Sequence, residues 1–145
     1  MLDITFLKHS LDPYENEYGN TCIGYEHLVH KGVITENDAS INEETEMTYY
    51  EMDSQSIINL LETTTQDFND NQLTALISLI LSIGIIPFRN SYMFSLLKKV
   101  RLKEAANQIK TYNKVNGIIN QKLVSRRLKE FNKFNEMFNE IEIEI

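Results

Sequence analysis

The sequence predicts a single α+β domain, in which a small β-containing lobe comes first and a larger helical lobe packs around one buried helix. Residues 14–28 mix Asn and Gly with Tyr, Cys and Ile, a composition typical of short strands joined by turns. After residue 42, apolar side chains recur at helical spacing. Residues 73–88 are apolar nearly all round, which indicates a helix at the centre of a core. A length of 145 residues fits one such domain.

The first long helix has a clear start. Asn42 is a favourable N-cap, and Glu43 and Glu44 lie where carboxylates meet the positive end of a helix. We expect this helix to end near Glu62. Its core-facing stripe is predicted to consist of Met47, Tyr50, Ser54, Ile57, Ile58 and Leu61.

The remaining helices follow from the same periodicity. The next one begins at Asp70 or Asn71 and runs to Gly84, after which Pro87 helps to break the chain. Three more helices are predicted, over residues 91–99, 103–112 and 122–139. The last of them should carry an apolar face formed by Val124, Leu128, Phe131 and Phe138.

The ending E-I-E-I-E-I, residues 140–145, has a period of two, which suits a strand better than a helix. We expect this tail either to dock on the protein's own small sheet or to pair with a neighbouring chain, and the alternative is a frayed polar tail. The domain 1–145 thus divides into a β-containing lobe at about 1–42, a helical lobe at about 43–139, and the acidic tail at 140–145.

Charge is distributed unevenly along the chain. The net charge is −7, but residues 1–70 hold two basic and fifteen acidic side chains, which gives −13, and residues 71–145 hold twelve basic and six acidic ones, which gives +6. This two-sided charge favours mixed-charge self-association that weakens in high salt. The basic stretch 89–133 contains Tyr92, Phe94 and Tyr112 but no recognisable nucleic-acid motif, so we do not expect a nucleic-acid partner.

The sequence also bears on compartment. The N-terminus has no basic start followed by an apolar run, so we expect no signal peptide and a cytoplasmic protein, with release by lysis or export left open. A single cysteine, Cys22, fits a reducing compartment. The apolar stretch from Leu73 to Phe88 falls short of the ~20 residues of a membrane span, and we expect no membrane partner.

Three segments resemble the phage-type lysozymes, glycoside hydrolase family 24. The segment "DPYENEYGNTCIGYEHL" is similar to the family's A-Y-x-D-x-x-G-x-x-T-I-G-Y-G-H-L. The segment "FNDNQLTALISLILSIGIIPFRNSYMFSLLKK" is similar to L-N-x-N-Q-x-D-A-L-x-S-F-x-F-N-x-G-x-x-x-F-x-x-S-T-L-L-K-K. Near the end, "YNKVNGIINQKLVSRRLKEF" is similar to W-N-K-x-x-G-x-x-x-x-G-L-V-x-R-R-x-x-E. The resemblance covers most of the chain in the family's order and implies a lysozyme-like fold.

The resemblance implies hydrolysis of the β-1,4 glycosidic bond of peptidoglycan, without a cofactor. In the family the work falls to a Glu on the first helix, an Asp in the hairpin and a Thr before I-G. The corresponding positions here are Leu7, Asn16 and Cys22. Leu cannot deliver a proton, Asn cannot act as a carboxylate, and a thiol aligns water weakly. We therefore interpret the chain as a lysozyme-fold pseudoenzyme that binds a peptidoglycan fragment or a protein partner.

The alternative is an active endolysin in which Glu26 or Asp12 replaces the missing acid. In either case the resemblance places the binding cleft at four residues, Tyr14, Tyr25, Glu26 and His27. Glu26 stands where the family has Gly, so its charge either supplies the acid or narrows the cleft. His27 is the one polar cleft residue that the chain keeps, and we expect a structural hydrogen-bonding role for it.

Other singled-out residues have two interpretations each. Cys22 is either a redox nucleophile or, as we favour, a small half-buried hydrophobe. His27 and His30 are spaced as a metal pair but lack a third ligand, so we expect no metal site. Arg126 and Arg127 suit either an acidic partner or a solvated helix face with internal salt bridges.

Overall fold

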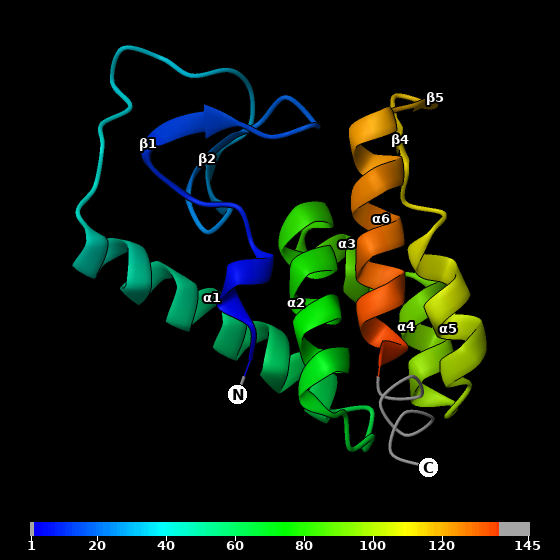
Figure 1. The fold of residues 1–145 in the computed structure, drawn as a ribbon. Coiled ribbons are helices and arrows are strands. Elements are labelled where there is room, and N and C mark those ends of the chain that lie inside the picture. Colours follow the sequence, from blue (N-terminus) through cyan, green and yellow to red (C-terminus); the bar gives the residue numbers. More distant parts are fainter. Residues whose placement is uncertain (1, 137–145) are drawn as a thin grey trace.

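The computed structural model describes residues 2–136 and shows a small antiparallel sheet beside a group of helices (Figure 1). This confirms the predicted α+β fold. A short 3₁₀ turn, η1 (Ile4–Phe6), precedes the strands β1 (Ser10–Glu15), β2 (Thr21–Gly24) and β3 (His27–His30). The helices are α1 (Glu43–Glu62), α2 (Asp70–Ile83), α3 (Ile85–Arg89), α4 (Tyr92–Lys98), α5 (Leu102–Ile109) and α6 (Gln121–Phe134). A second, two-stranded sheet, β4 (Lys114–Val115) and β5 (Ile118–Ile119), separates α5 from α6.

The three-stranded sheet has the order β1-β2-β3, with each neighbouring pair antiparallel. Tyr14 pairs with Cys22, and Ile23 pairs with His27. The central strand β2 is buried along its whole length. The strands predicted within residues 14–28 are therefore present, although β1 already begins at Ser10.

Helix α1 begins and ends where the sequence predicts. Asn42 caps it by accepting a hydrogen bond from the Thr45 amide at 2.8 Å. The predicted core stripe is right at Ser54, Ile57 and Leu61, which are buried, and wrong at Met47, which is 40% exposed. Glu46 is buried in its place because its carboxylate pairs with His9 at 3.1 Å.

Helix α2 is the buried centre of the helical lobe, as predicted. A capping box between Asn69 and Gln72 starts it, and it lies between α1 and α6 (Figure 1). Its apolar side chains form the middle of the core, with Ala75, Leu76, Leu79 and Ile80 at most 1% exposed. The expectation that Pro87 breaks the chain is wrong. Pro87 lies in the first turn of α3, where a missing N–H removes no helical hydrogen bond.

Helix α6 differs from the prediction in its buried face. The described helix ends at Phe134, and residues 137–139 of the predicted helix, with Phe138, lie outside the described residues. Leu128, predicted to face the core, is 50% exposed. The buried positions are instead Leu123, Arg127, Glu130 and Phe134. Two ionisable residues occupy this face because they bind one another, as described below.

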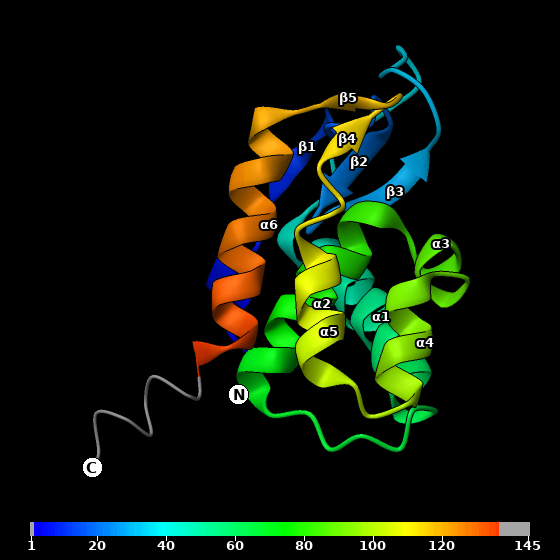
Figure 2. The same ribbon diagram turned by 90° about the vertical axis from the view of Figure 1, so that its right-hand side faces the viewer.

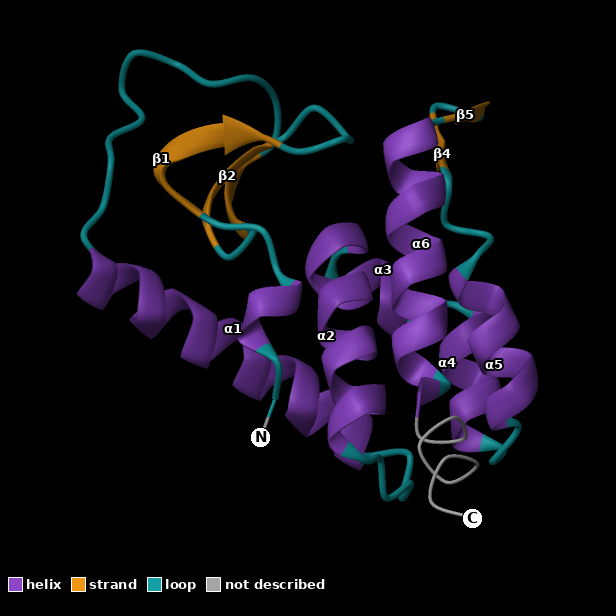
Figure 3. Ribbon diagram, in the orientation of Figure 1, coloured by secondary structure: helices purple, strands orange, loops and turns teal. Residues whose placement is uncertain are grey.

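The β4–β5 hairpin was not predicted. Its two turn residues, Asn116 and Gly117, have φ of 50° and 79°, the left-handed pair that an Asn-Gly turn favours. The hairpin lies at the N-terminal end of α6, the end nearer the three-stranded sheet (Figures 2 and 3). The opposite end of α6, where the described chain stops, is far from both sheets (Figure 1).

Two further expectations concern the C-terminal tail with the lobe boundaries, and the absence of a membrane-spanning helix. The predicted strand at 140–145 lies outside the described residues, and the boundaries at about 42 and 139 stay predictions. Within residues 2–136, no helix is long and apolar enough to cross a bilayer.

Candidate functional site

The three positions expected to carry catalysis hold side chains that are packed or committed to hydrogen bonds. Leu7 follows η1 and is 7% exposed; it lines a narrow internal space with Tyr50, Thr74 and Ile77. The side-chain oxygen of Asn16 accepts hydrogen bonds from the amides of Tyr18 and Asn20, both at 3.0 Å. Leu7 thus serves the core between helices, and Asn16 holds the turn between β1 and β2.

Cys22 is buried on the central strand, 2% exposed. Burial, together with the negative charges of Glu26 and Glu17, raises the pKa of its thiol to about 11. A thiol that stays protonated is a poor nucleophile. The interpretation of Cys22 as a small hydrophobe agrees with this environment, although the residue is more deeply buried than expected.

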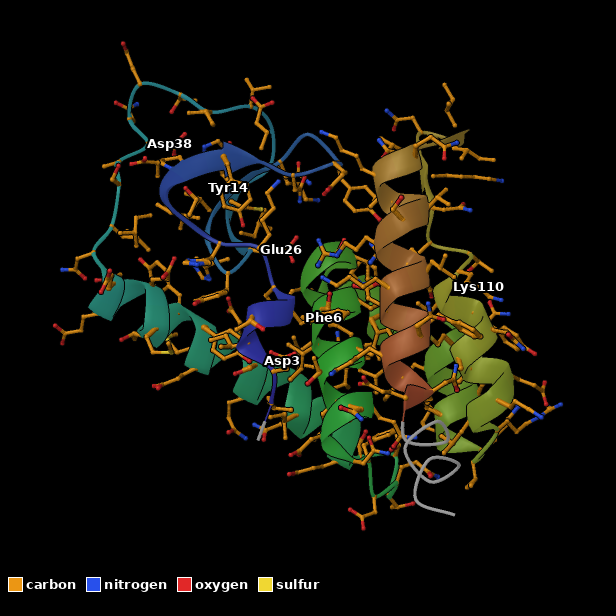
Figure 4. All side chains as sticks on the ribbon, in the orientation of Figure 1. Asp3, Phe6, Tyr14, Glu26, Asp38 and Lys110 are labelled. Carbon is orange, nitrogen blue, oxygen red and sulfur yellow. The ribbon has the colours of Figure 1, made fainter. Side chains whose placement is uncertain are left out.

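Glu26 lies in the connection between β2 and β3 and has a φ of 57°. This left-handed backbone is unfavourable for a residue with a Cβ. The phenol of Tyr14 fixes the connection, because its oxygen accepts from the Glu26 amide at 2.9 Å and donates to the Gly24 carbonyl at 3.0 Å. Tyr14 and Glu26 therefore lie together in the β-containing lobe (Figure 4).

The Glu26 side chain reaches across to α6. Both of its carboxylate oxygens accept hydrogen bonds from the Arg126 guanidinium, each at 2.5 Å. The Glu26 side chain is 6% exposed and that of Arg126 is 17% exposed. Burial alone would lower the Arg126 pKa, but the hydrogen bonds and charges of Glu26 and Glu130 outweigh it and raise that pKa. The pair joins residues one hundred positions apart and ties the β-containing lobe to the helical lobe.

A buried polar network continues from Arg126 into the core. Glu130, fully buried, accepts from Arg126 at 3.2 Å, from Arg127 at 2.6 Å and from the Ser78 hydroxyl at 2.5 Å. Arg127, 1% exposed, also donates to the Ser82 hydroxyl at 2.5 Å and to the Tyr112 carbonyl at 2.8 Å. Among the described residues, no buried side-chain nitrogen or oxygen lacks a partner. Both arginines thus make internal salt bridges, but the solvated helix face that we expected is wrong.

The other two cleft residues face α1. His27 contacts the Asp53 carboxylate at 2.7 Å and stacks on Tyr49 with ring centroids 4.1 Å apart. Tyr25 stacks on His9 at 4.6 Å and lies against Tyr50 at 5.3 Å. The structural hydrogen-bonding role expected for His27 agrees with this geometry. The four predicted cleft residues therefore fall into two groups, one toward α6 and one toward α1.

His30 does not join His27. The two are three apart on β3 and so lie on opposite faces of the strand. His30 contacts Asp38 at 2.8 Å instead. Within residues 2–136, no group of three or more His, Cys, Asp or Glu side chains is arranged to hold a metal ion.

Asp12, the second candidate for a relocated acid, is exposed on β1. Its carboxylate accepts a hydrogen bond from the Ser40 hydroxyl at 2.5 Å. This contact joins β1 to the long loop that leads into α1. Among the described residues, the Asp12 carboxylate makes no hydrogen bond with Tyr14, Cys22 or Glu26, so Asp12 does not join the other candidate residues.

Two functional contacts were missed from the sequence. Arg126 was expected to meet either an acidic partner or solvent on a helix face with internal salt bridges, and Glu26 was not named as its partner; Asp53 was not singled out as the partner of His27. The sequence offered one signal for the first contact: Glu26 stands where the family pattern has Gly, and two arginines, Arg126 and Arg127, lie on the last predicted helix. Nothing in the spacing shows that these segments meet.

The phage lysozyme family model matches residues 6–130. A search of curated protein sequences finds no significant match. Several solved structures share the fold. The endolysin from Escherichia coli O157:H7 phage FAHEc1 is 22% identical, with a TM-score of 0.65 over 90% of this chain and 85% of that one. The muramidase domain of SpmX from Asticaccaulis excentricus is 23% identical, with a TM-score of 0.67 over 90% and 89%.

The active form of the P1 phage endolysin Lyz is 17% identical, with a TM-score of 0.67 over 92% of this chain and 80% of that one. At these identities the likeness shows a common fold. The family model adds a sequence match over most of the chain. The chain belongs to the phage lysozyme family.

Proposed function

We propose that this protein is a lysozyme-fold binding protein without muramidase activity. One observation carries the proposal. Glu26, the first of the two candidate replacement acids, has both carboxylate oxygens bound by Arg126. An acid that protonates a leaving group needs a proton on an oxygen that can reach the substrate. Glu26 offers no such oxygen while the ion pair is intact.

The remaining site residues support the same conclusion. Glycoside hydrolysis in this family's manner needs a second group that holds water or stabilises charge. The Asn16 amide is neutral and holds a turn, and the Cys22 thiol is buried with a pKa raised to about 11. Neither the packed hydrocarbon of Leu7 nor these two groups can replace an ionised carboxylate. Losing each positioned acid or base costs roughly 10²–10⁴ in rate.

For the binding role we propose a peptidoglycan fragment or a protein as partner, with the cleft residues Tyr14, Tyr25, Glu26 and His27 at the contact. The aromatic groups support this role. His27 stacked on Tyr49, and Tyr25 stacked on His9, form two flat surfaces beside α1. Flat aromatic surfaces contribute apolar contact area at low cost in conformational entropy.

The test measures cleavage and binding separately. The purified protein is incubated with exposed cell walls, and turbidity and new reducing ends are followed. We expect no activity above that of a heat-denatured sample. Clearing that disappears in Glu26→Gln would overturn the proposal and assign the acid to Glu26. Clearing that survives Glu26→Gln but disappears in Asp12→Asn would assign it to Asp12.

Co-sedimentation with purified insoluble peptidoglycan then identifies the partner class. Sedimentation with the wall material supports a glycan partner, and its absence supports a protein partner. A restored variant provides the positive control for the scaffold. It carries Leu7→Glu, Lys8→Gly, Asn16→Asp, Cys22→Thr and Glu26→Gly. Cleavage by this variant, with a cooperative unfolding transition that shows it is folded, would show that the wild-type defect lies at these positions.

A further inference from the structure

A groove unrelated to the candidate site lies at the far end of the helical lobe. It has a volume of about 870 Å³, within the range of ligand-binding pockets. Its apolar lining comes mainly from α6 and from the start of α5: Phe131, Phe134, Val100, Leu102 and Ala106. Val100 is 66% exposed and Leu102 and Phe131 are half-buried, so these three carry the open apolar surface, whereas Phe134 and Ala106 are buried beneath it.

Val100 is also strained. It follows α4, where its amide donates to the Leu97 carbonyl at 3.2 Å and the next amide, of Arg101, donates to the Leu96 carbonyl at 3.0 Å. This is a Schellman motif, in which the position of Val100 is usually Gly. Its φ of 63° is unfavourable for a β-branched residue. An exposed, strained valine contributes little to folding, so its presence in the groove points to a contact made there.

The rim of the groove is basic. The charged residues that line it are Arg101, Lys103 and Glu104, for a net of +1. Glu104 is paired with Arg101 at 2.7 Å. Lys103 lines the groove and has no ion-pair partner among residues 2–136. The groove therefore suits a ligand that presents apolar and acidic groups together.

The chain itself ends in such a sequence. Residues 137–145, which lie outside the described part, read M-F-N-E-I-E-I-E-I and carry three acidic and no basic side chains. Phe134 and Asn135, among the last described residues, line the groove, so this segment starts at its rim. Nine residues reach up to about 30 Å. Both sheets lie toward the other half of α6, since Glu26 of the β2–β3 connection pairs with Arg126 and β4–β5 directly precede the helix, so the groove is closer to the start of this segment.

We propose that this groove is the binding site of the chain's own ending, residues 140–145. Ile141, Ile143 and Ile145 supply the apolar groups for Phe131, Leu102 and Val100. Glu140, Glu142 and Glu144 supply the charges for Arg101 and Lys103. Covalent attachment raises the effective concentration of the segment at the groove to about the millimolar range, so modest contacts suffice. The proposal is independent of the proposed function.

The test uses the full-length chain. Ile141, Ile143 and Ile145 are all changed to Ser, which keeps the length and removes the apolar groups. A fluorescent peptide of residues 137–145 is then titrated onto this variant and onto the wild type at low and high salt. We expect the peptide to bind the variant, to bind the wild type less because its groove is occupied, and to bind both more weakly in high salt.

Matched groove variants locate the site. In the Ser-substituted chain, Lys103→Glu should weaken the peptide about fivefold or more, whereas Lys122→Glu, an exposed lysine at the other end of the molecule, should leave it unchanged. Val100→Gly should weaken the peptide while raising the melting temperature, which separates binding from unfolding. A charge exchange, Lys103→Glu with a peptide carrying Glu142→Lys, should recover affinity.

Three results would overturn the proposal. One is the absence of peptide binding to the Ser-substituted chain at low salt. Another is an equal loss of affinity in Lys103→Glu and Lys122→Glu. The third is a concentration-dependent dimer of the wild type, seen by light scattering and abolished by the Ser substitutions, which would assign the segment to the neighbouring molecule's groove.

Discussion

Replacing Glu26 by Gly has two opposing effects on the free energy of unfolding: it removes an ion pair and it relieves backbone strain. The substitution removes both hydrogen bonds to Arg126 from a pair whose side chains are 6% and 17% exposed. Breaking a largely buried pair by removing one partner costs about 3–5 kcal/mol. Gly accepts the φ of 57° freely, which returns about 1–2 kcal/mol. The net loss in the free energy of unfolding is therefore about 1–4 kcal/mol.

The lower half of that range is expected, because Arg126 keeps the Glu130 carboxylate at 3.2 Å and the Ser78 carbonyl at 2.8 Å. For a chain of this size that corresponds to a fall in melting temperature of roughly 3–8 °C. Glu26→Ala should lose more than Glu26→Gly, since Ala keeps the backbone strain. The difference between these two variants measures the strain directly.

Urea unfolding followed by far-UV circular dichroism provides the assay. Arg126→Met is measured alone and together with Glu26→Gly. We expect a coupling energy between the two substitutions of at least about 1 kcal/mol, because each removes the other's partner. A Glu26→Gly variant as stable as the wild type, with a coupling energy near zero, would refute the view that this pair ties the lobes together.

Three further predictions follow from the ionisable groups. The Lys31 carbonyl and Asp38 raise the pKa of His30, and the Thr35 amide and His30 lower that of Asp38. The ion pair between them should therefore stabilise the loop that contains Asp38 most between pH 3.8 and 6.5. The contribution of His30 is lost as the pH rises through its raised pKa, and that of Asp38 is lost as the pH falls through its lowered pKa. NMR titration should place the His30 midpoint above 6.5 in the wild type and at a lower pH in Asp38→Asn. Ellman's reagent should react slowly with Cys22 in the folded protein and fast in urea, and equal rates would contradict its burial. Arg127→Met should lower the free energy of unfolding by about 3–5 kcal/mol by leaving the Glu130 charge buried, and a loss below 1 kcal/mol would show that water reaches Glu130.

Local signals predicted most of the helical lobe. Asn42 and the acidic residues after it indicated the start of α1, and the largely apolar run, interrupted only by Thr74, Ser78 and Ser82, indicated α2 as the central helix. The buried face of α6 could not be predicted this way. Arg127 and Glu130 are charged, and charged residues usually lie on the surface. Their burial is tolerated because they form a salt bridge with each other, and because Glu130 also bonds Ser78 and Arg127 also bonds Ser82. Those serines lie about fifty residues earlier in the chain.

The candidate site shows the same division between local and long-range information. The proposed losses at Leu7, Asn16 and Cys22 could be inferred from the sequence because each concerns the chemistry of one side chain. The partner of Glu26 is not, because the contact with Arg126 depends on how β2–β3 and α6 are placed relative to each other. The β4–β5 hairpin is an exception. Its Asn116-Gly117 turn is a local signal that was present and overlooked.

Two departures from the family pattern are best understood together. By the resemblance to the family, Leu7 stands at the expected position of the catalytic Glu, and Glu26 stands at the expected position of a Gly. A glutamate at left-handed φ is retained against about 1–2 kcal/mol of strain, so some interaction must offset that strain. The two hydrogen bonds with Arg126 provide it, and without Glu26 this guanidinium, 17% exposed, would keep Glu130 as its one carboxylate partner among residues 2–136. Under the proposed function, the Glu26 carboxylate therefore joins the β-containing lobe to the helical lobe and does not serve as an acid.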